Sequence, residues 1–257
     1  MKIFNQRLPE NPNLHRLPGT RPVEADHWLE IDDAFAAQMA YRDQLLVTKR
    51  ADVFQCDPGA DQAAAELLDR VVDHVLTQPG YERAGNIIRR PDDRDVELGS
   101  DHPLIEAARL VQEDLCILEK RGGQEHLLTG AVLCFPASWS LGEKFMHPMS
   151  RIHAPVTSYD TRIEKGVQRM FDVLRPGMVL CRGNLLAYRD ADLHSPRTEG
   201  NRRNVPVYGA AEYLRAERQC LIRLEKSDAI IFTIHSYVVP RTALQADQKE
   251  LIDTLNL

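Results

Sequence analysis

Two histidines six residues apart are the first candidates for chemistry in this sequence. His147 and His153 lie in the crowded stretch CFPASWSLGEKFMHPMSRIHAPV, residues 134–156, where prolines restrict the backbone. A neutral imidazole on such a rigid segment can bind a haem iron, provided that its other ring nitrogen donates to a carbonyl or carboxylate. A structural role is nevertheless the commoner one for a histidine such as His153, and a surface position suits His147 equally well.

Other reactive side chains give weaker signals. Glu113 and Asp114 are adjacent, and neighbours on a helix point about 100 degrees apart, so we expect them to be charges on a helix face. Cys134 and Cys181 stand in apolar runs typical of strands, where a thiol is usually buried and inert. His194 is an alternative metal ligand without a supporting pattern.

Strand alternation makes specific predictions for two side chains in residues 212–240. Arg218 shares its strand face with apolar residues, and a buried charge needs a partner. Arg218 therefore either forms a structural ion pair with an acidic neighbour in the core or clamps an anionic ligand. His235, a further alternative metal ligand, shares its face with Thr233 and Tyr237, which favours solvent or a polar cavity as its surroundings.

Hydrophobic periodicity predicts helices first and strands later. Helical spacing covers 26–50, 60–78, 101–120 and 159–174, with Asp101 as a cap and Pro103 in the first turn of the third helix. Strand patterns cover 126–136, 177–189 and 212–240, and the last of these breaks at Glu225–Asp228 as an antiparallel hairpin does. This order predicts an α+β fold, with a helical N-terminal layer packed on an antiparallel sheet.

The composition narrows the class of protein. The chain has 257 residues, 43% of them hydrophobic and 27% charged, which is typical of a soluble globular protein. A net charge of -6 argues against a nucleic-acid binder, and no apolar window is long enough for a membrane span. The five cysteines form no Cys-x-x-Cys pair, so we expect reduced thiols. Because the N-terminus also lacks an apolar run of signal-peptide length, we expect a cytoplasmic location.

Proline-rich residues 1–22 are expected to form an extended arm, and residues 23–257 a single domain. The chain lacks a Rossmann glycine pattern, a P-loop and a Gly-x-Ser-x-Gly elbow.

Six segments taken together resemble the haem-dependent oxidative N-demethylase α-subunit family, in family order and over roughly residues 20–245. They are LVQEDLCIL (Leu110–Leu118), CFPASWSLGEK (Cys134–Lys144), IHAPV (Ile152–Val156), LRPG (Leu174–Gly177), RGN (Arg182–Asn184) and LRAERQCLIRLEKSDAIIFTIHSYV (Leu214–Val238). The resemblance implies a PAS-like core, a curved antiparallel sheet flanked by helices. It also implies haem b, O2 as a substrate, and oxidative demethylation of a small amine with release of formaldehyde.

In that family, electrons come from partner subunits that carry nicotinamide, flavin and iron-sulfur sites, and this chain shows none of those motifs. The resemblance therefore implies that the chain is the haem-bearing mono-oxygenase subunit. It carries over His153 as the proximal ligand of the haem iron, and Lys144, Arg182 and Arg218 as partners of the haem propionates. Phe135 and Trp139 would pack the pocket.

The sequence departs from the family pattern at several positions. His147 and His235 stand where the family usually has Arg, Leu185 where it commonly has Trp, and Thr157 where it usually has Pro. These differences predict a divergent member with altered propionate anchoring and pocket shape. The alternatives are a non-catalytic haem-binding sensor or interaction subunit of PAS type, and a homologue that shares only the fold. The chain lacks an output module or coiled coil, which favours the enzyme over the sensor.

Overall fold

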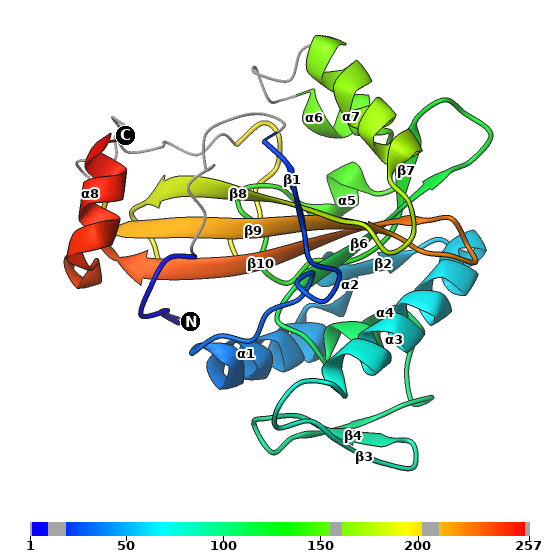
Figure 1. Cartoon of the computed structure of the whole chain (residues 1–257), viewed down its shortest axis with the longest axis horizontal. Helices are drawn as coiled ribbons and strands as arrows, with labels where there is room; N and C mark the ends of the chain where they lie inside the picture. The colour runs from blue at the N-terminus through cyan, green and yellow to red at the C-terminus, as the bar shows by residue number, and fades with distance from the viewer. Residues whose placement is uncertain (1, 10–18, 155–160, 202–210, 255–257) are drawn as a thin grey trace.

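An antiparallel sheet forms the centre of the computed structural model, which describes residues 2–9, 19–154, 161–201 and 211–254 (Figure 1). The strands of the main sheet are β1 (Arg21–Val23), β2 (Phe54–Cys56), β6 (Asp114–Lys120), β7 (His126–Val132), β8 (Val179–Tyr188), β9 (Tyr213–Arg223) and β10 (Ile230–Pro240). Within the described residues they lie in the order β1-β8-β9-β10-β6-β7-β2, and every neighbouring pair is antiparallel.

The helices cover both faces of this sheet. They are α1 (Phe35–Thr48), α2 (Arg50–Val53), α3 (Asp61–Val75), α4 (Pro103–Ala108), α5 (Leu141–Lys144), α6 (Met149–His153), α7 (Thr161–Val173) and α8 (Ala246–Thr254), with short 3-10 helices at Pro58–Ala60 and Arg241–Ala243. A small sheet of β3 (Glu82–Ala84), β4 (Ile87–Arg89) and β5 (Asp95–Glu97) lies beyond α3 and α4. Figure 1 shows α1, α3 and α4 below the main sheet and α5, α6 and α7 above it.

Alternation along the strands divides the core between these two faces. Val179, Cys220 and Ile222 point to one face and pack in a single cluster with residues of α1, α3 and α4, so we call it the α3 face. Leu221, Ile230 and Leu180 point to the other, where they pack with residues of α5, α6 and α7, and we call it the α6 face. The two faces present different side chains to different helices.

The predicted α+β class is confirmed, and so is the order of the last three strands. β8, β9 and β10 are successive neighbours in the sheet, and β9 and β10 form the predicted hairpin, closed by a hydrogen bond from Leu224 N to Ala229 O. Helix α3 has the predicted apolar stripe, with Ala64, Leu67 and Val71 buried. The likeness of the sheet to PAS domains stays a prediction of the family resemblance.

The helix predicted over 101–120 is wrong in its second half. Helix α4 ends at Ala108, and the chain then continues as strand β6 from Asp114. Leu115–Leu118 is apolar at every position because this strand is buried on both faces, and such a run cannot be told from a buried helix by periodicity. The cap is His102 rather than Asp101, although Pro103 stands at the first helical position as predicted.

The prediction for 26–50 is likewise right only in part, since α1 begins at Phe35.

The expectation of five reduced cysteines is also wrong, because Cys181 and Cys220 form a disulfide. They lie directly opposite each other on β8 and β9, with Cα atoms 4.2 Å apart, while Cys56, Cys116 and Cys134 are free thiols. The two cysteines are 39 residues apart in the sequence, and only the register of β8 and β9 brings them together, so the sequence did not predict the disulfide.

The N-terminal residues that the structure describes pack against the sheet. Ile3 and Leu8 are buried, Asn5 N donates to Val238 O, and β1 extends the sheet beside β8. The division into an arm of residues 1–22 and a domain of 23–257 stays a prediction. Among the described helices, none combines the length and the apolar character that a membrane crossing requires.

Candidate functional site

His153 is the last residue of α6 and lies on the α6 face of the sheet. Its Nδ1 is 3.0 Å from the backbone oxygen of Met149, one helical turn earlier. A carbonyl only accepts, so Nδ1 carries the proton, and the lone pair of the neutral ring is on Nε2. This is the tautomer that a histidine needs in order to ligate a metal through Nε2.

The surroundings of His153 keep the ring neutral. Burial lowers the pKa of His153, and the positive charges of Lys144 and Arg182 lower it further, against the opposing effect of the hydrogen bond to Met149. Three of the four residues predicted to bind the cofactor are therefore close enough to interact. A neutral imidazole beside two cations suits a metal ligand whose cofactor also carries negative charge.

Lys144 holds the end of α6 in place. The side chain is buried, and its Nζ donates to Ile152 O at 2.8 Å and to Glu199 Oε1 at 2.6 Å. Arg151 binds the same Glu199 carboxylate at 2.8 Å, and hydrogen bonds from Arg151 and Lys144 lower the pKa of Glu199 to about 2. The ammonium group of Lys144 thus fixes the residue directly before His153.

Arg182 on β8 is a half-buried cation with no counter-ion among the described residues. No carboxylate among the described residues lies within ion-pair distance of its guanidinium, and its Nε is buried without a hydrogen-bond partner there. Burial lowers the pKa of Arg182, opposed by the more distant charge of Glu217. Because an unpaired buried charge is costly, this guanidinium is suited to an anionic ligand.

A row of polar side chains continues from Arg182 across the α6 face. Gln219 lies opposite Arg182 on β9, and Gln219 Nε2 donates to Glu217 Oε2 at 2.9 Å. Asn184 is 3.4 Å from the same oxygen. Asn184, Glu217 and Gln219 are not among the site residues predicted from the sequence. Strand alternation could have indicated them, because it places all three on the same face of β8 and β9 as Arg182.

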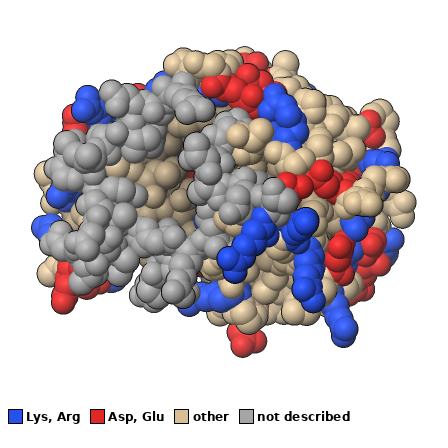
Figure 2. Space-filling view, turned by 90° about the horizontal axis from the view of Figure 1, so that it is seen from above, with Lys and Arg blue, Asp and Glu red and all other residues tan. Residues whose placement is uncertain are grey.

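Figure 2 shows the molecule from this side, where several Lys and Arg side chains lie close together with Asp and Glu side chains among them. Trp139 packs at the edge of the apolar cluster on this face, whereas Phe135 is buried in the cluster of the α3 face. Of the two aromatic residues expected to pack the pocket, only Trp139 therefore lies on the same face as His153.

Arg218 does not join the other three predicted residues. It points to the α3 face, where its Nε lies 2.8 Å from Glu30 Oε1 and its guanidinium also donates to the His27 carbonyl. The structural ion pair considered for this inward arginine is thus confirmed. The structure brings His153, Lys144 and Arg182 together and leaves Arg218 across the sheet.

His235 is the centre of a second charged cluster on the α3 face. Its ring is fully buried, with Nδ1 2.9 Å from Glu113 Oε1 and Nε2 3.0 Å from Asp32 Oδ2. Burial alone would lower the pKa of His235, but the charges of Glu113 and Asp32 outweigh it and raise the pKa to about 10. Of the two surroundings expected for His235, the polar one is correct and solvent is not. The two carboxylates hold the His235 ring as a cation.

Glu113 and Asp114 are not charges on a helix face, as expected, because both are completely buried. Asp114 forms an ion pair with Arg42 at 3.0 Å, and its two oxygens accept from Cys134 N and Phe135 N, each at 2.8 Å. Asp114 therefore fixes the beginning of the crowded stretch that leads to His153.

The remaining candidates have structural surroundings. Burial raises the pKa of the Cys134 thiol to about 12, in keeping with the inert role expected for it. His194 Nδ1 lies 2.9 Å from Cys134 O, and His147 is exposed. Neither histidine lies in a group of potential metal ligands among the described residues.

The chain also matches a known protein family. The family model described as "Haem-dependent oxidative N-demethylase, alpha subunit-like" matches residues 19–256. The chain belongs to this family. Its members are named for a haem-dependent oxidative N-demethylase, so the match indicates haem dependence, and the designation of an alpha subunit implies that other subunits take part. The resemblance found in six sequence segments is confirmed.

Proposed function

We propose that this chain binds haem b on the α6 face through His153 and that it oxidatively demethylates a small amine. The observation that carries the proposal is the hydrogen bond from His153 Nδ1 to the Met149 carbonyl, because it fixes the tautomer whose lone pair is on Nε2. Membership of the haem-dependent family supports the same assignment.

The residues around His153 fit a haem in charge as well as in ligand type. A haem carries two propionates, and the guanidinium of Arg182 is the half-buried cation that lacks a carboxylate partner among the described residues. Lys144 adds positive charge at the same place, but its hydrogen bonds hold Ile152 and Glu199. We therefore assign Arg182 as the propionate partner and Lys144 as a positioning residue, and we assign Arg218 no contact with the cofactor.

When bound, haem supplies the activation of O2 and the oxidation of the N-methyl carbon. In the balanced reaction, an N-methylated amine, one O2, two electrons and two protons give the demethylated amine, formaldehyde and water, with the electrons supplied by partner subunits. The chain contributes a neutral imidazole at His153, a compensating charge at Arg182, and apolar side chains of the α6 face that exclude water.

An absorption spectrum of the purified protein supplied with haem tests the ligand. We expect a Soret band in the wild type that is lost or strongly shifted in His153→Ala and regained when free imidazole is added to that variant. The matched control is His147→Ala, which removes an exposed histidine six residues away and should leave the spectrum unchanged. An unchanged spectrum in His153→Ala would refute this assignment.

Formaldehyde release tests the reaction. With a chemical or enzymatic electron donor and O2, we expect the haem-loaded chain to release formaldehyde from a small methylamine, and His153→Ala to release none. A chain whose haem is reduced and binds O2, yet gives no formaldehyde across a panel of secondary and tertiary methylamines, would instead be a haem-binding sensor or interaction subunit.

A further inference from the structure

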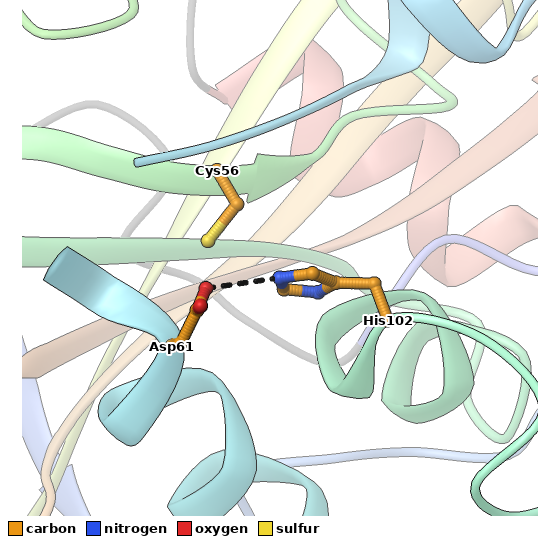
Figure 3. A group of neighbouring side chains, drawn as sticks. All are labelled: Cys56, Asp61 and His102. Atoms are coloured by element: carbon orange, nitrogen blue, oxygen red, sulfur yellow. Dashed lines mark hydrogen bonds and ion pairs between the residues drawn. The ribbon is translucent and has the colours of Figure 1, made fainter. Parts of the chain in front are cut away.

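A group of three metal-binding side chains lies on the α3 face, across the sheet from His153. Cys56 ends β2, Asp61 begins α3, and His102 is the residue directly before α4 (Figure 3). Each residue offers one ligand atom, and these three atoms lie within 4.8 Å of one another. They are the thiol sulfur, a carboxylate oxygen and a ring nitrogen. Residues far apart in the sequence thus offer three different ligand types at one point.

The surrounding structure holds two of these side chains in position. Phe54 and Cys56 point to the same face of β2, and the Phe54 ring packs on the His102 ring with centroids 5.0 Å apart. Gly130 lies opposite Cys56 on β7, and a Cβ atom at Gly130 would come within 3.1 Å of the sulfur. The absent side chain at Gly130 therefore leaves room for the thiol.

The separation of the histidine nitrogen and the carboxylate oxygen suits a small tetrahedral metal centre. His102 Nε2 lies 3.3 Å from Asp61 Oδ1. Zinc bonds to nitrogen and oxygen of about 2.0–2.1 Å in a tetrahedral arrangement place two such atoms about 3.3 Å apart. We propose that Cys56, Asp61 and His102 bind a zinc ion, with the fourth position taken by water. The carboxylate side chain of Asp61 is 63% exposed, so solvent reaches this point.

The local charges favour a cation. Burial raises the pKa of the Cys56 thiol to about 12, and the carboxylates of Asp61, Glu119 and Asp57 raise it further against the opposing charge of Arg121. Three carboxylates face the thiol from the end of β6, the segment after β2 and the start of α3. Arg121 already pairs with Asp57 at 3.5 Å and with Glu119 at 2.8 Å, so a divalent cation would act on the charge of Asp61 and would stabilise the thiolate that zinc requires.

A nucleophilic role for Cys56 is not supported by the same geometry. In a catalytic triad the carboxylate binds one ring nitrogen and the nucleophile the other. Here Asp61 approaches His102 Nε2, while Nδ1 accepts the backbone N–H of Leu104 and caps α4. The carboxylate therefore occupies the nitrogen that the thiol would need.

The hydrogen bond from Leu104 N–H to His102 Nδ1 offers a specific test of zinc binding. Because Nδ1 accepts from Leu104, the neutral ring has its proton on Nε2 and donates it to Asp61. Zinc at Nε2 displaces that proton, and the ring must then be protonated at Nδ1, which ends the hydrogen bond from Leu104. Zinc binding should thus make the Leu104 amide exchange faster with solvent.

The test uses the full chain with Zn2+ and with Co2+ as a spectroscopic probe. We expect Co2+ to give a charge-transfer band from the thiolate in the near ultraviolet, which Cys56→Ser abolishes. Competition with a chromophoric chelator should show that Cys56→Ser and Asp61→Asn each weaken Zn2+ binding at least about tenfold. The matched control is Asp69→Asn, the same change at an exposed residue of the same helix, and it should leave the affinity unchanged.

Two results would overturn the zinc site. One is Zn2+ binding that is no tighter in the wild type than in Cys56→Ser, when both variants unfold at the same temperature without metal. The other is a Co2+ spectrum without a thiolate band. The site is independent of the proposed function, since His153→Ala should keep the zinc affinity and Cys56→Ser should keep the Soret band.

Discussion

Arg218 and His235 on the α3 face differ from Arg182 on the α6 face in whether a carboxylate of the described residues partners them. On the α3 face, the cations Arg218 and His235 each contact a carboxylate at 3.0 Å or less. On the α6 face, Arg182 has no carboxylate at ion-pair distance among the described residues, and His153 is kept neutral. The paired charges therefore have a structural role, whereas Arg182 beside a neutral imidazole suits the haem site that we propose.

The largest effect should follow from breaking the balanced cluster. His235→Ala leaves the carboxylates of Glu113 and Asp32 buried without their cation, so we expect a loss of about 3–5 kcal/mol in the free energy of unfolding. Urea denaturation measures this change. The exposed-site variant His147→Ala should stay within about 0.5 kcal/mol of the wild type. An equally small loss in His235→Ala would mean that the cluster does not stabilise the fold.

The pH dependence of stability should separate the two histidines. The pKa of His235 is raised to about 10 in the folded state, so its contribution is complete below about pH 6.5 and is lost as the pH rises toward about 10. The pKa of His153 is lowered, so its neutral ring costs stability only as the pH falls below about 6.5. Unfolding at a series of pH values, with and without His235→Ala, measures the alkaline loss, which should disappear in the variant.

Arg182→Gln should distinguish ligand binding from stability. Removing a half-buried cation that has no carboxylate partner in the described part of the chain should change the free energy of unfolding of the haem-free chain by less than about 1 kcal/mol. Loss of a charge-assisted contact of about 1.5–3 kcal/mol should weaken haem binding about 10- to 100-fold. Haem titration followed by the Soret band gives the affinity. A large loss of stability with an unchanged haem affinity would place Arg182 with the structural cations.

Lys144→Met should have the smallest effect on haem affinity. The variant keeps the length of the side chain but loses the hydrogen bonds to Ile152 O and Glu199, so the end of α6 is held less firmly. We expect a weakening of severalfold, because the side chain acts through the position of His153 rather than by direct contact. Haem titration is again the measurement, with Lys165→Met on the exposed side of α7 as the control. A loss as large as that in Arg182→Gln would indicate direct contact.

Several features of the fold could be predicted because they depend on local pattern. The hairpin of β9 and β10 follows from two alternating runs joined by four polar residues, and α3 follows from its apolar stripe. The start of β6 could not be predicted, since Leu115–Leu118 is apolar throughout and fits a buried helix as well as a central strand. The same limit applies to Glu113 and Asp114, whose burial depends on partners supplied by distant segments.

The amino-acid sequence by itself determined the α+β class and the family, because both rest on residue types in a fixed order, and it supplied His153 as the proposed haem ligand. Only the tertiary structure decided which charges share a face. Arg182 and Arg218 are both inward-facing strand residues, yet one lies beside His153 and the other pairs with Glu30 on the α3 face. The disulfide of Cys181 and Cys220 and the grouping of Cys56, Asp61 and His102 were decided in the same way, because strand register and helix packing join positions that are remote in sequence.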